Sequence, residues 1–209
     1  MELNLTFILI GITVLVSWAA WQKPEMMHQL IFQPYAVQRD NSWYRFLTSG
    51  FLHADFSHLF FNMFTLYFFG TNVEYTFTGI FGLIPGELCY LLVYLGGIIV
   101  SDIPTFLKHR NDPPYRALGA SGGVASVLFA SILFYPITPV CLFAALCVPG
   151  FIFGVLYMMY SYFSGRRMAG NINHDAHFYG ALYGFVLSLA LVPQTLPNFF
   201  EQISQWRLF

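Results

Sequence analysis

The sequence contains few charged side chains. Asp, Glu, Lys and Arg make up only 9% of its 209 residues, whereas 57% are hydrophobic and 20% are aromatic. A soluble domain has about 25% charged residues, so this composition excludes a chain that faces water on all sides. The formal net charge of -1 also excludes a strongly basic surface, and we expect no nucleic-acid partner. We expect the lipid bilayer to surround most of the chain.

Cysteine is also scarce. Cys89, Cys141 and Cys147 lie inside apolar runs, their number is odd, and no two have C-x-x-C spacing. We therefore expect no disulfide and no zinc–cysteine site, and we interpret all three as small apolar side chains in helices. The sequence predicts no cofactor and no metal.

A cleavable leader is not indicated either. The first apolar run, residues 5–21, lacks a basic n-region and an A-x-A-like cleavage site. We interpret it as the first of several membrane spans, since a spanning helix needs about 20 apolar residues. Six segments qualify, with Pro- and Gly-containing breaks between them: about 4–22, 57–75, 80–102, 117–135, 138–163 and 174–192. The predicted fold is a single all-α membrane domain, residues 1–209, built as a six-helix bundle.

The first connection, residues 23–56, is long and rich in aromatic side chains. Aromatic residues mixed with arginines such as Arg39 and Arg45 are typical of segments at the membrane–water interface. Two interpretations stay open for this segment. It is either an aromatic belt that anchors the bundle or a folded cap beside a site.

Four polar residues lie near the start of the even-numbered spans. His58 and Asn62 begin the second span, Ser121 begins the fourth and His177 begins the sixth. These three spans run in the same direction, and each helical residue advances 1.5 Å, so the four groups fall within about 10 Å of one membrane face. Polar groups are costly in hydrocarbon. Their common depth predicts one shared site.

Ser121 and His177 are the candidate nucleophile and base. A serine needs a base to take its proton, and imidazole is the usual base near neutral pH. Gly122 next to Ser121, and Gly180 and Gly184 after His177, are small residues that allow two helix backbones to approach closely. We expect this approach to bring Ser121 and His177 within hydrogen-bond distance.

Attack on a carbonyl creates an oxyanion that needs hydrogen-bond donors. His58 and Asn62 are four residues apart and project from one helix face. Their side chains are candidate donors, together with the backbone N–H groups of Gly119 and Ser121 early in the fourth span. The sequence thus predicts an oxyanion site beside the nucleophile.

Two neighbours of His177 have different expected roles. Asp175 is two residues away and points about 200° around a helix, so we predict a Ser–His dyad without a carboxylate. His174 is three residues away and shares the face of His177, so it lines the pocket or holds water. His53 precedes the second span, and the sequence assigns it no role.

Each motif also has a purely structural interpretation. Gly-x-Ser-Gly is commonly a packing motif in which the serine bonds to its own i−4 carbonyl. His58 with Asn62 could join two helices by a hydrogen bond, and His177 could be an ordinary interior histidine. The shared depth of all four groups favours the catalytic interpretation.

As a set, these residues resemble the rhomboid family of intramembrane serine proteases. The resemblance covers about residues 43–190 and rests on His58-Leu59-Phe60-Phe61-Asn62, Gly119-Ala120-Ser121-Gly122 and Ala176-His177-Phe178-Tyr179-Gly180. It implies that Ser121 is the nucleophile and His177 the general base, and that His58 and Asn62 help to stabilise the oxyanion. It also implies cleavage of other membrane proteins near the top of a transmembrane helix, without metal or nucleotide.

The resemblance extends to two structural residues and shows two departures. Arg45 resembles an arginine of the family's membrane-associated first loop, and Glu74 a glutamate at the far end of the second span. The family often has a tyrosine four residues after the serine, where the ring of the base packs, but this chain has Ala125. The usual Trp-Arg pair is interrupted by Tyr44. The sequence therefore leaves open what orients His177.

The basic residues give a conflicting indication of orientation. The first, third and fifth connections contain Lys23, Arg39, Arg45, Lys108, Arg110, Arg116, Arg166 and Arg167, whereas only Arg207 lies on the other side. The positive-inside rule places those connections in the cytoplasm. Many bacterial rhomboids instead have both termini in the cytoplasm and the site near the outer face. We follow the family and expect a multi-pass protein of the bacterial cytoplasmic membrane.

The function predicted from the sequence is that of a serine endopeptidase acting on transmembrane substrates. The alternative is a catalytically weak or inactive relative that binds client helices. A third class, a metal-dependent hydrolase or metal transporter, is prompted by His53, His58, His174, Asp175 and His177. The spacing lacks H-E-x-x-H and Asp175 faces away from His177, which disfavours this third class.

Overall fold

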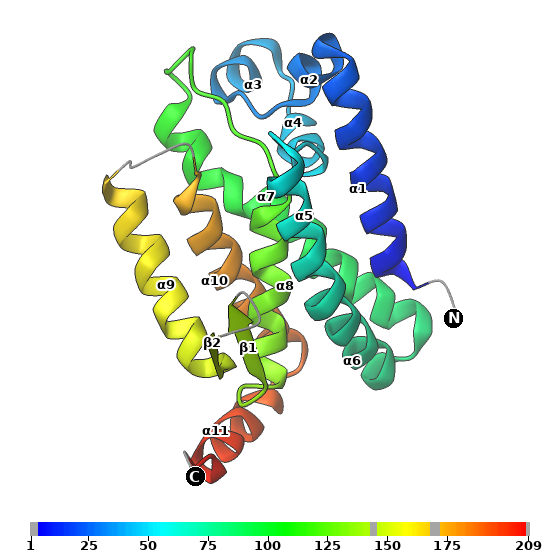
Figure 1. The fold of residues 1–209 in the computed structure, drawn as a ribbon, viewed down its shortest axis with the longest axis vertical. Coiled ribbons are helices and arrows are strands. Elements are labelled where there is room, and N and C mark those ends of the chain that lie inside the picture. The colour runs from blue at the N-terminus through cyan, green and yellow to red at the C-terminus, as the bar shows by residue number, and fades with distance from the viewer. Residues whose placement is uncertain (1–3, 143–145, 168–171, 208–209) are drawn as a thin grey trace.

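A computed structural model describes residues 4–142, 146–167 and 172–207, and most of them are helical (Figure 1). The longer helices are α1 (Leu5–Gln22), α5 (Phe56–Thr65), α6 (Thr71–Phe81), α7 (Leu83–His109), α8 (Ser121–Phe134), α9 (Gly150–Arg167), α10 (His174–Leu191) and α11 (Thr195–Gln205). A π-helical turn, η2 (Leu66–Gly70), joins α5 to α6. The predicted second span is therefore one nearly continuous helical stretch with an irregular turn in its middle.

Four short elements fold the first connection. They are α2 (Pro24–Leu30), α3 (Pro34–Asp40), α4 (Arg45–Thr48) and the 3-10 turn η1 (Ser49–Phe51). Proline opens α2 and α3, where its fixed φ suits the first helical position. These elements lie at the end of the bundle where α5, α8 and α10 begin (Figure 1). The connection is thus folded over that end, as one of its two interpretations requires.

Arg45 is buried within this folded connection. Its guanidinium donates to the carbonyl oxygens of His28 and Ile31, each at 2.8 Å, and to the Ser42 hydroxyl at 3.0 Å. A buried charge needs such partners. Arg45 therefore joins α2 and the chain that follows it to α4.

Glu74 of α6 holds the start of α1. Its carboxylate accepts hydrogen bonds from the backbone N–H groups of Leu5 and Thr6, at 2.7 and 2.9 Å, and from the Thr6 hydroxyl at 2.6 Å. The first N–H groups of a helix have no partner within the helix, and a negative charge is favourable there. Glu74 therefore fixes one end of α1 against α6.

The central helix is α8, which packs against α7 and α10 (Figure 1). Every residue from Gly122 to Phe134 is buried. Glycines allow α7 to approach it closely, since a Cβ added at Gly97 would lie 3.1 Å from the Gly123 Cα. The Ser126 hydroxyl donates to the Val93 carbonyl oxygen of α7 at 2.7 Å. The start of α8 is thereby fixed within the bundle.

By length and composition, two helices in the described residues could cross a membrane, α1 and α7. A third is added if α10 and α11, which are bent by 112°, are counted as one span. The helix α8 has only 14 residues, fewer than the roughly 20 that a span needs. The six spans predicted from the sequence are therefore only partly present by this measure.

The prediction that the fifth span, 138–163, is helical from its first residue is wrong. An antiparallel hairpin of β1 (Pro139–Leu142) and β2 (Leu146–Pro149) precedes α9, so the described fold is not purely helical. A short apolar run does not distinguish strand from helix by periodicity alone. Pro139 and Pro149 pair at the open end of the hairpin, a strand end where the missing N–H of proline is tolerated.

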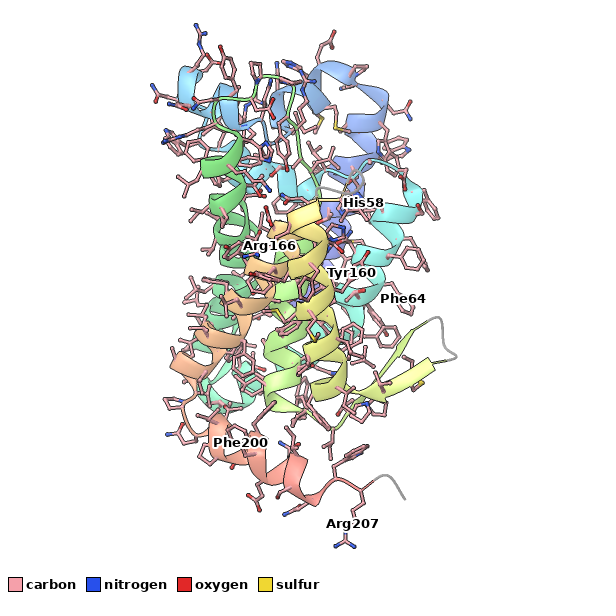
Figure 2. The ribbon with its side chains drawn as sticks, turned by 90° about the vertical axis from the view of Figure 1, so that its left-hand side faces the viewer. His58, Phe64, Tyr160, Arg166, Phe200 and Arg207 are labelled. Atoms are coloured by element: carbon pink, nitrogen blue, oxygen red, sulfur yellow. A yellow bond between two sulfur atoms is a disulfide. The ribbon has the colours of Figure 1, made fainter. Side chains whose placement is uncertain are left out.

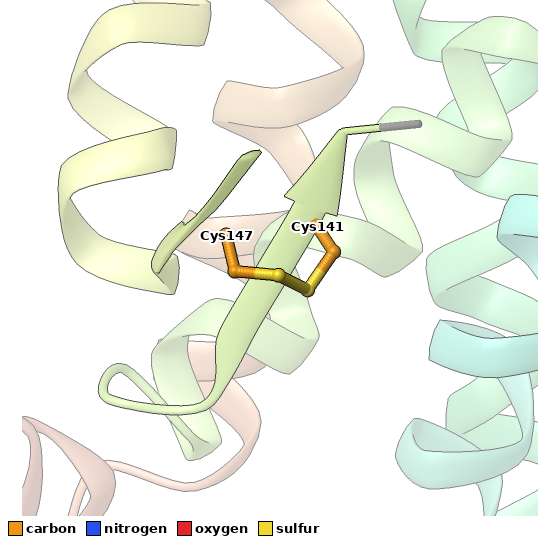
Figure 3. Close-up of a disulfide and its surroundings, with 2 residues drawn as sticks. All are labelled: Cys141 and Cys147. Atoms are coloured by element: carbon orange, nitrogen blue, oxygen red, sulfur yellow. A yellow bond between two sulfur atoms is a disulfide. The ribbon is translucent and has the colours of Figure 1, made fainter. Parts of the chain in front are cut away.

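The expectation that no disulfide forms is also wrong. Cys141 and Cys147 face each other across this hairpin and are joined by a disulfide (Figure 3). Cys89 in α7 is the free cysteine. The odd number of cysteines was misleading, because a chain with one free cysteine can still form a disulfide between the other two.

Candidate active site

Glycines bring α8 and α10 into direct backbone contact. A Cβ added at Gly180 would lie 2.9 Å from the Gly122 carbonyl carbon, and one at Gly184 would lie 2.5 Å from the Ser126 Cα. From the first contact to the second, the residue number rises by four on each helix, from 180 to 184 on α10 and from 122 to 126 on α8. The two helices therefore run parallel. Any side chain at either glycine would collide with the α8 backbone.

This contact places the starts of α8 and α10 side by side. Ser121 is the first residue of α8 and precedes Gly122, while His177 lies in the first turn of α10. A small cavity of about 20 Å³ is lined by both helix starts, including Ser121, Asn173 and Ala176. In the described part of the chain, no hydrogen bond joins the Ser121 hydroxyl to the His177 ring. The hydrogen bond that the sequence led us to expect between these two side chains is therefore not formed in the structure.

The ring of His177 is surrounded by other rings. Tyr157 of α9 lies nearly parallel to it, with centroids 6.2 Å apart and an interplanar angle of 18°. His174 lies edge-on to it at 5.9 Å. Among the described residues, no hydrogen bond reaches the His177 ring. The Asp175 carboxylate turns to Lys108 instead, at 3.1 Å.

His58 and Asn62 lie on α5 at the edge of this site. A Cβ added at Gly119 would lie 2.7 Å from the His58 Cε1 and 2.8 Å from its Nε2, so the His58 ring rests on Gly119. The Asn62 side-chain amide donates to the His58 carbonyl oxygen at 2.9 Å. In Figure 2, His58 lies in the upper half of the molecule and Arg207 at its lower end. The His58 ring thus lies against Gly119, which is two residues before Ser121 in the chain.

The N–H of Gly119, one of the oxyanion donors expected from the sequence, already has a hydrogen-bond partner in the structure. It donates to the Ser49 carbonyl oxygen at 3.0 Å. With a φ of 125°, Gly119 adopts a conformation that other residues rarely take. The glycine therefore shapes the turn before Ser121. The backbone N–H of Ser121 opens α8, where N–H groups have no partner in the helix, and it remains the backbone candidate.

His53 belongs to this region, although the sequence assigned it no role. It is fully buried, and its Nε2 accepts from the Ala120 N–H at 3.4 Å. Its Nδ1 lies 3.0 Å from the Ser17 hydroxyl, which donates to the Phe51 carbonyl oxygen at 2.8 Å. The ring also lies edge-on to His58, with centroids 4.9 Å apart. His53 therefore links α1, the first connection and the residue before Ser121.

The protonation state of His53 follows from its burial. Burial lowers the pKa of His53 from 6.5 to about 3. The neutral ring can accept from Ala120 with Nε2 while Nδ1 donates to Ser17, whereas a protonated ring has no acceptor. The arrangement therefore requires one neutral tautomer.

Two further polar residues near Ser121, Asp102 and Asn173, belong to none of the motifs predicted from the sequence. Both line the small cavity beside Ser121, and Asp102 is buried. The Asn173 side chain accepts from the Ala176 N–H at 3.2 Å, which caps α10, and its amide lies 3.4 Å from the Asp102 Oδ1. A lone acidic residue within an apolar run was the available sequence signal for Asp102.

The apolar helices and the buried polar residues at their ends define a helical membrane protein. Residues 40–194 match the family model described as the Rhomboid domain. The chain belongs to the rhomboid family, which includes intramembrane serine proteases.

Three relatives illustrate this membership. "RHOMBOID-like protein 12, mitochondrial" from Arabidopsis thaliana is 26% identical over 181 residues, which cover 80% of this chain and 52% of that protein. "Rhomboid-like protein 11, chloroplastic" from the same plant is 33% identical over 169 residues, which cover 73% of this chain and 54% of that protein. "Putative rhomboid protease YdcA" from Bacillus subtilis (strain 168) is 30% identical over 157 residues, which cover 73% of this chain and 69% of that protein. The chain spans about half the length of the two plant relatives.

Proposed function

We propose that this chain is an intramembrane serine endopeptidase that hydrolyses peptide bonds in or near transmembrane segments of other membrane proteins. The observation that carries the proposal is the backbone contact between Gly122 and Gly180. This contact sets the helix that begins with Ser121 beside the first turn that holds His177. A nucleophile and a base on adjacent helix starts form the smallest unit of serine catalysis.

The reaction begins with proton transfer from the Ser121 hydroxyl to the His177 ring. The Ser121 oxygen attacks the carbonyl carbon of the substrate, and the electron pair of the C=O bond moves to its oxygen. The Ser121 N–H, the His58 ring and the second amide proton of Asn62 stabilise this oxyanion. The C–N bond then breaks, and His177 returns the proton to the leaving amine.

Water completes the reaction. His177 takes a proton from a water molecule, whose oxygen attacks the acyl carbon on Ser121. The second tetrahedral intermediate collapses, the carboxylic acid product leaves, and the proton returns to the Ser121 oxygen. The small cavity beside Ser121, of about 20 Å³, has room for one water molecule.

The proposed setting is a six-span bundle in the bacterial cytoplasmic membrane, with the site near the outer face. The mitochondrial and chloroplastic names of the plant relatives make an organelle membrane the alternative location. The distribution of basic residues opposes the outer-face orientation. A disulfide in the hairpin after α8 also opposes it, because that orientation places the hairpin in the cytoplasm, where disulfides are rare.

Single cysteines in place of Lys108 and Arg166 decide the orientation. Labelling of intact cells by a membrane-impermeant maleimide supports the outer-face orientation, and labelling only after lysis contradicts it.

A non-catalytic protein that binds client helices is the second candidate. The missing hydrogen bond between the Ser121 hydroxyl and the His177 ring favours it. Cleavage of a model transmembrane substrate in proteoliposomes distinguishes the two candidates. We expect cleavage by the unmodified chain and a loss of at least about a thousandfold in Ser121→Ala. Equal cleavage by Ser121→Ala would overturn the protease proposal, and substrate binding without cleavage by the unmodified chain would support the second candidate.

A further inference from the structure

We propose that Tyr157 of α9 is the positioning residue that orients the His177 ring. The inference rests on the proposed function and extends it to a residue outside the motifs. The two rings are nearly parallel, with an interplanar angle of 18° and centroids 6.2 Å apart. This separation lies within the range of favourable offset stacking, about 4.5–7 Å.

Other groups near His177 do not restrain its ring in the same way. No hydrogen bond from the described residues reaches the ring, and Asp175 is paired with Lys108. His174 meets it edge-on, at an angle of 79°. Ala125, one turn after Ser121 in α8, is buried but carries only a methyl group. Among the described residues, the ring lying parallel to His177 is that of Tyr157.

Tyr157 is itself held by two phenylalanines. Phe129 of α8 lies 5.6 Å from it, and Phe153 lies 5.8 Å from it on the preceding turn of α9. Phe129 is four residues after Ala125, so it lies one turn further along α8. A row of rings thus runs from α8 through α9 to α10. The central helix supports the base through Phe129 and Tyr157.

Stacking suits the task of His177 for a chemical reason. A parallel ring restrains rotation of the imidazole about its Cβ–Cγ bond without occupying either nitrogen. Both nitrogens therefore stay free to take and return a proton. The aromatic face also favours the imidazolium that forms during the reaction.

The hydroxyl of Tyr157 is not needed for this role, which provides a sharp test. Tyr157→Phe keeps the flat ring, whereas Tyr157→Leu removes it, and Tyr157→Met fills similar space with a flexible chain. We expect Tyr157→Phe to retain kcat within about twofold. We expect Tyr157→Leu and Tyr157→Met to lower kcat by about 10–100-fold with little change in KM, because a small misplacement of a catalytic group has an effect of this size.

Tyr162→Leu is the matched control. Tyr162 lies on the same helix, but its ring contacts Phe178 and the Arg166 guanidinium and not His177. We expect this control to retain kcat. Thermal unfolding of every variant in the same detergent separates loss of fold from loss of orientation, and the labelling rate of Ser121 by a fluorophosphonate gives a readout that needs no substrate.

The outcomes separate this inference from the proposed function. If the unmodified chain neither cleaves substrate nor reacts with the fluorophosphonate, the proposed function fails. If it does both, the inference is overturned by normal kcat in Tyr157→Leu and Tyr157→Met, by an effect on KM alone, or by equal loss in Tyr157→Phe. A loss of kcat that is restored by phenylalanine and absent from Tyr162→Leu supports the positioning role.

Discussion

On one side of Ser121 the backbone is held by hydrogen bonds, whereas on the other side His177 is held by ring contacts. The N–H groups of Gly119 and Ala120 donate to the Ser49 carbonyl oxygen and to the His53 ring. The described residues give the His177 ring no such partner, and Tyr157 lies parallel to it. The same small region therefore uses two different means of fixing its groups.

In the proposed mechanism, the two sides of Ser121 have different tasks, and the difference in how they are held corresponds to those tasks. Donors for an oxyanion work best when they are oriented before charge develops, and a hydrogen-bonded turn provides that rigidity. In that mechanism a general base takes up and releases a proton twice in each cycle. A ring held by stacking keeps its nitrogens available for this exchange.

The largest effect is expected from breaking the contact between α8 and α10. Both the hydrogen-bonded side of Ser121 and the side of His177 depend on this contact. A methyl group at Gly184 would collide with the Ser126 backbone, and forcing extra atoms into such a contact costs about 1–3 kcal/mol or more. We therefore expect Gly184→Ala to lower the unfolding temperature and to abolish cleavage. Gly11→Ala is the matched control, because a Cβ at Gly11 has nothing within 4 Å, and a helical Gly→Ala change there is neutral or stabilising. Equal behaviour of both variants would refute the close contact.

The next effect tests the hydrogen-bonded side. His53→Leu leaves the buried Ala120 N–H without an acceptor, which costs about 1–3 kcal/mol. We expect lower stability and a loss of cleavage of about tenfold or more. Ser17→Ala removes the hydrogen bonds of the Ser17 hydroxyl to His53 and to the Phe51 carbonyl oxygen. It leaves the Ala120 N–H with its acceptor and should have a smaller effect. If His53→Leu cleaves substrate as well as the unmodified chain, the hydrogen-bonded side does not support catalysis.

The pH dependence of stability provides a second measure of His53. Its pKa is about 3 in the fold and 6.5 ordinarily, so between these values the unfolded chain binds a proton that the folded chain does not. Stability contributed by neutral His53 is present above pH 6.5 and is lost as the pH falls. Unfolding of His53→Leu should therefore take up one proton fewer in that window, as read from unfolding curves at several pH values. An unchanged slope would contradict the buried neutral histidine.

A smaller effect is expected from Asp175, on the side held by ring contacts. Its carboxylate pairs with Lys108 at 3.1 Å, and both side chains are partly exposed. Such pairs contribute about 0–1 kcal/mol. We expect Asp175→Asn to keep kcat within about threefold. A loss of a thousandfold or more would instead indicate a triad, and the comparison between the two sides would fail.

The smallest effect is expected from the hairpin disulfide, which touches neither side. The Cys141–Cys147 bond closes a short local loop after α8. Cys141→Ala with Cys147→Ala should leave cleavage within about twofold. A maleimide count on SDS-unfolded protein should find one thiol without reductant, that of Cys89, and three with it. Three thiols without reductant would show that the disulfide does not form.

The helices around the site could be predicted because their signals are local. Apolar runs broken by proline and glycine place residues 174–192 close to the observed α10, and the spacing of Gly180 and Gly184 marks the face that meets α8. The same local signals failed for the hairpin. Its apolar residues do not reveal their period over so short a run.

The residues that support the site could not be predicted for a different reason. His53 is 67 residues from Ala120, and Tyr157 and His177 lie on separate helices. Spacing along a helix shows which residues share a face, but the rotation of one helix against another is set by packing. Ala125 left open what packs against the His177 ring, and in the structure Tyr157 of α9 lies nearly parallel to that ring.

The most direct test of the Ser–His pair is covalent labelling by a fluorophosphonate, located by mass spectrometry of the labelled peptide. We expect the label on Ser121 of the unmodified chain and of Asp175→Asn. We expect no label in Ser121→Ala, and labelling slower by about a hundredfold or more in His177→Ala, with all four proteins folded. Labelling of another serine, or labelling of His177→Ala at the unmodified rate, would contradict the account.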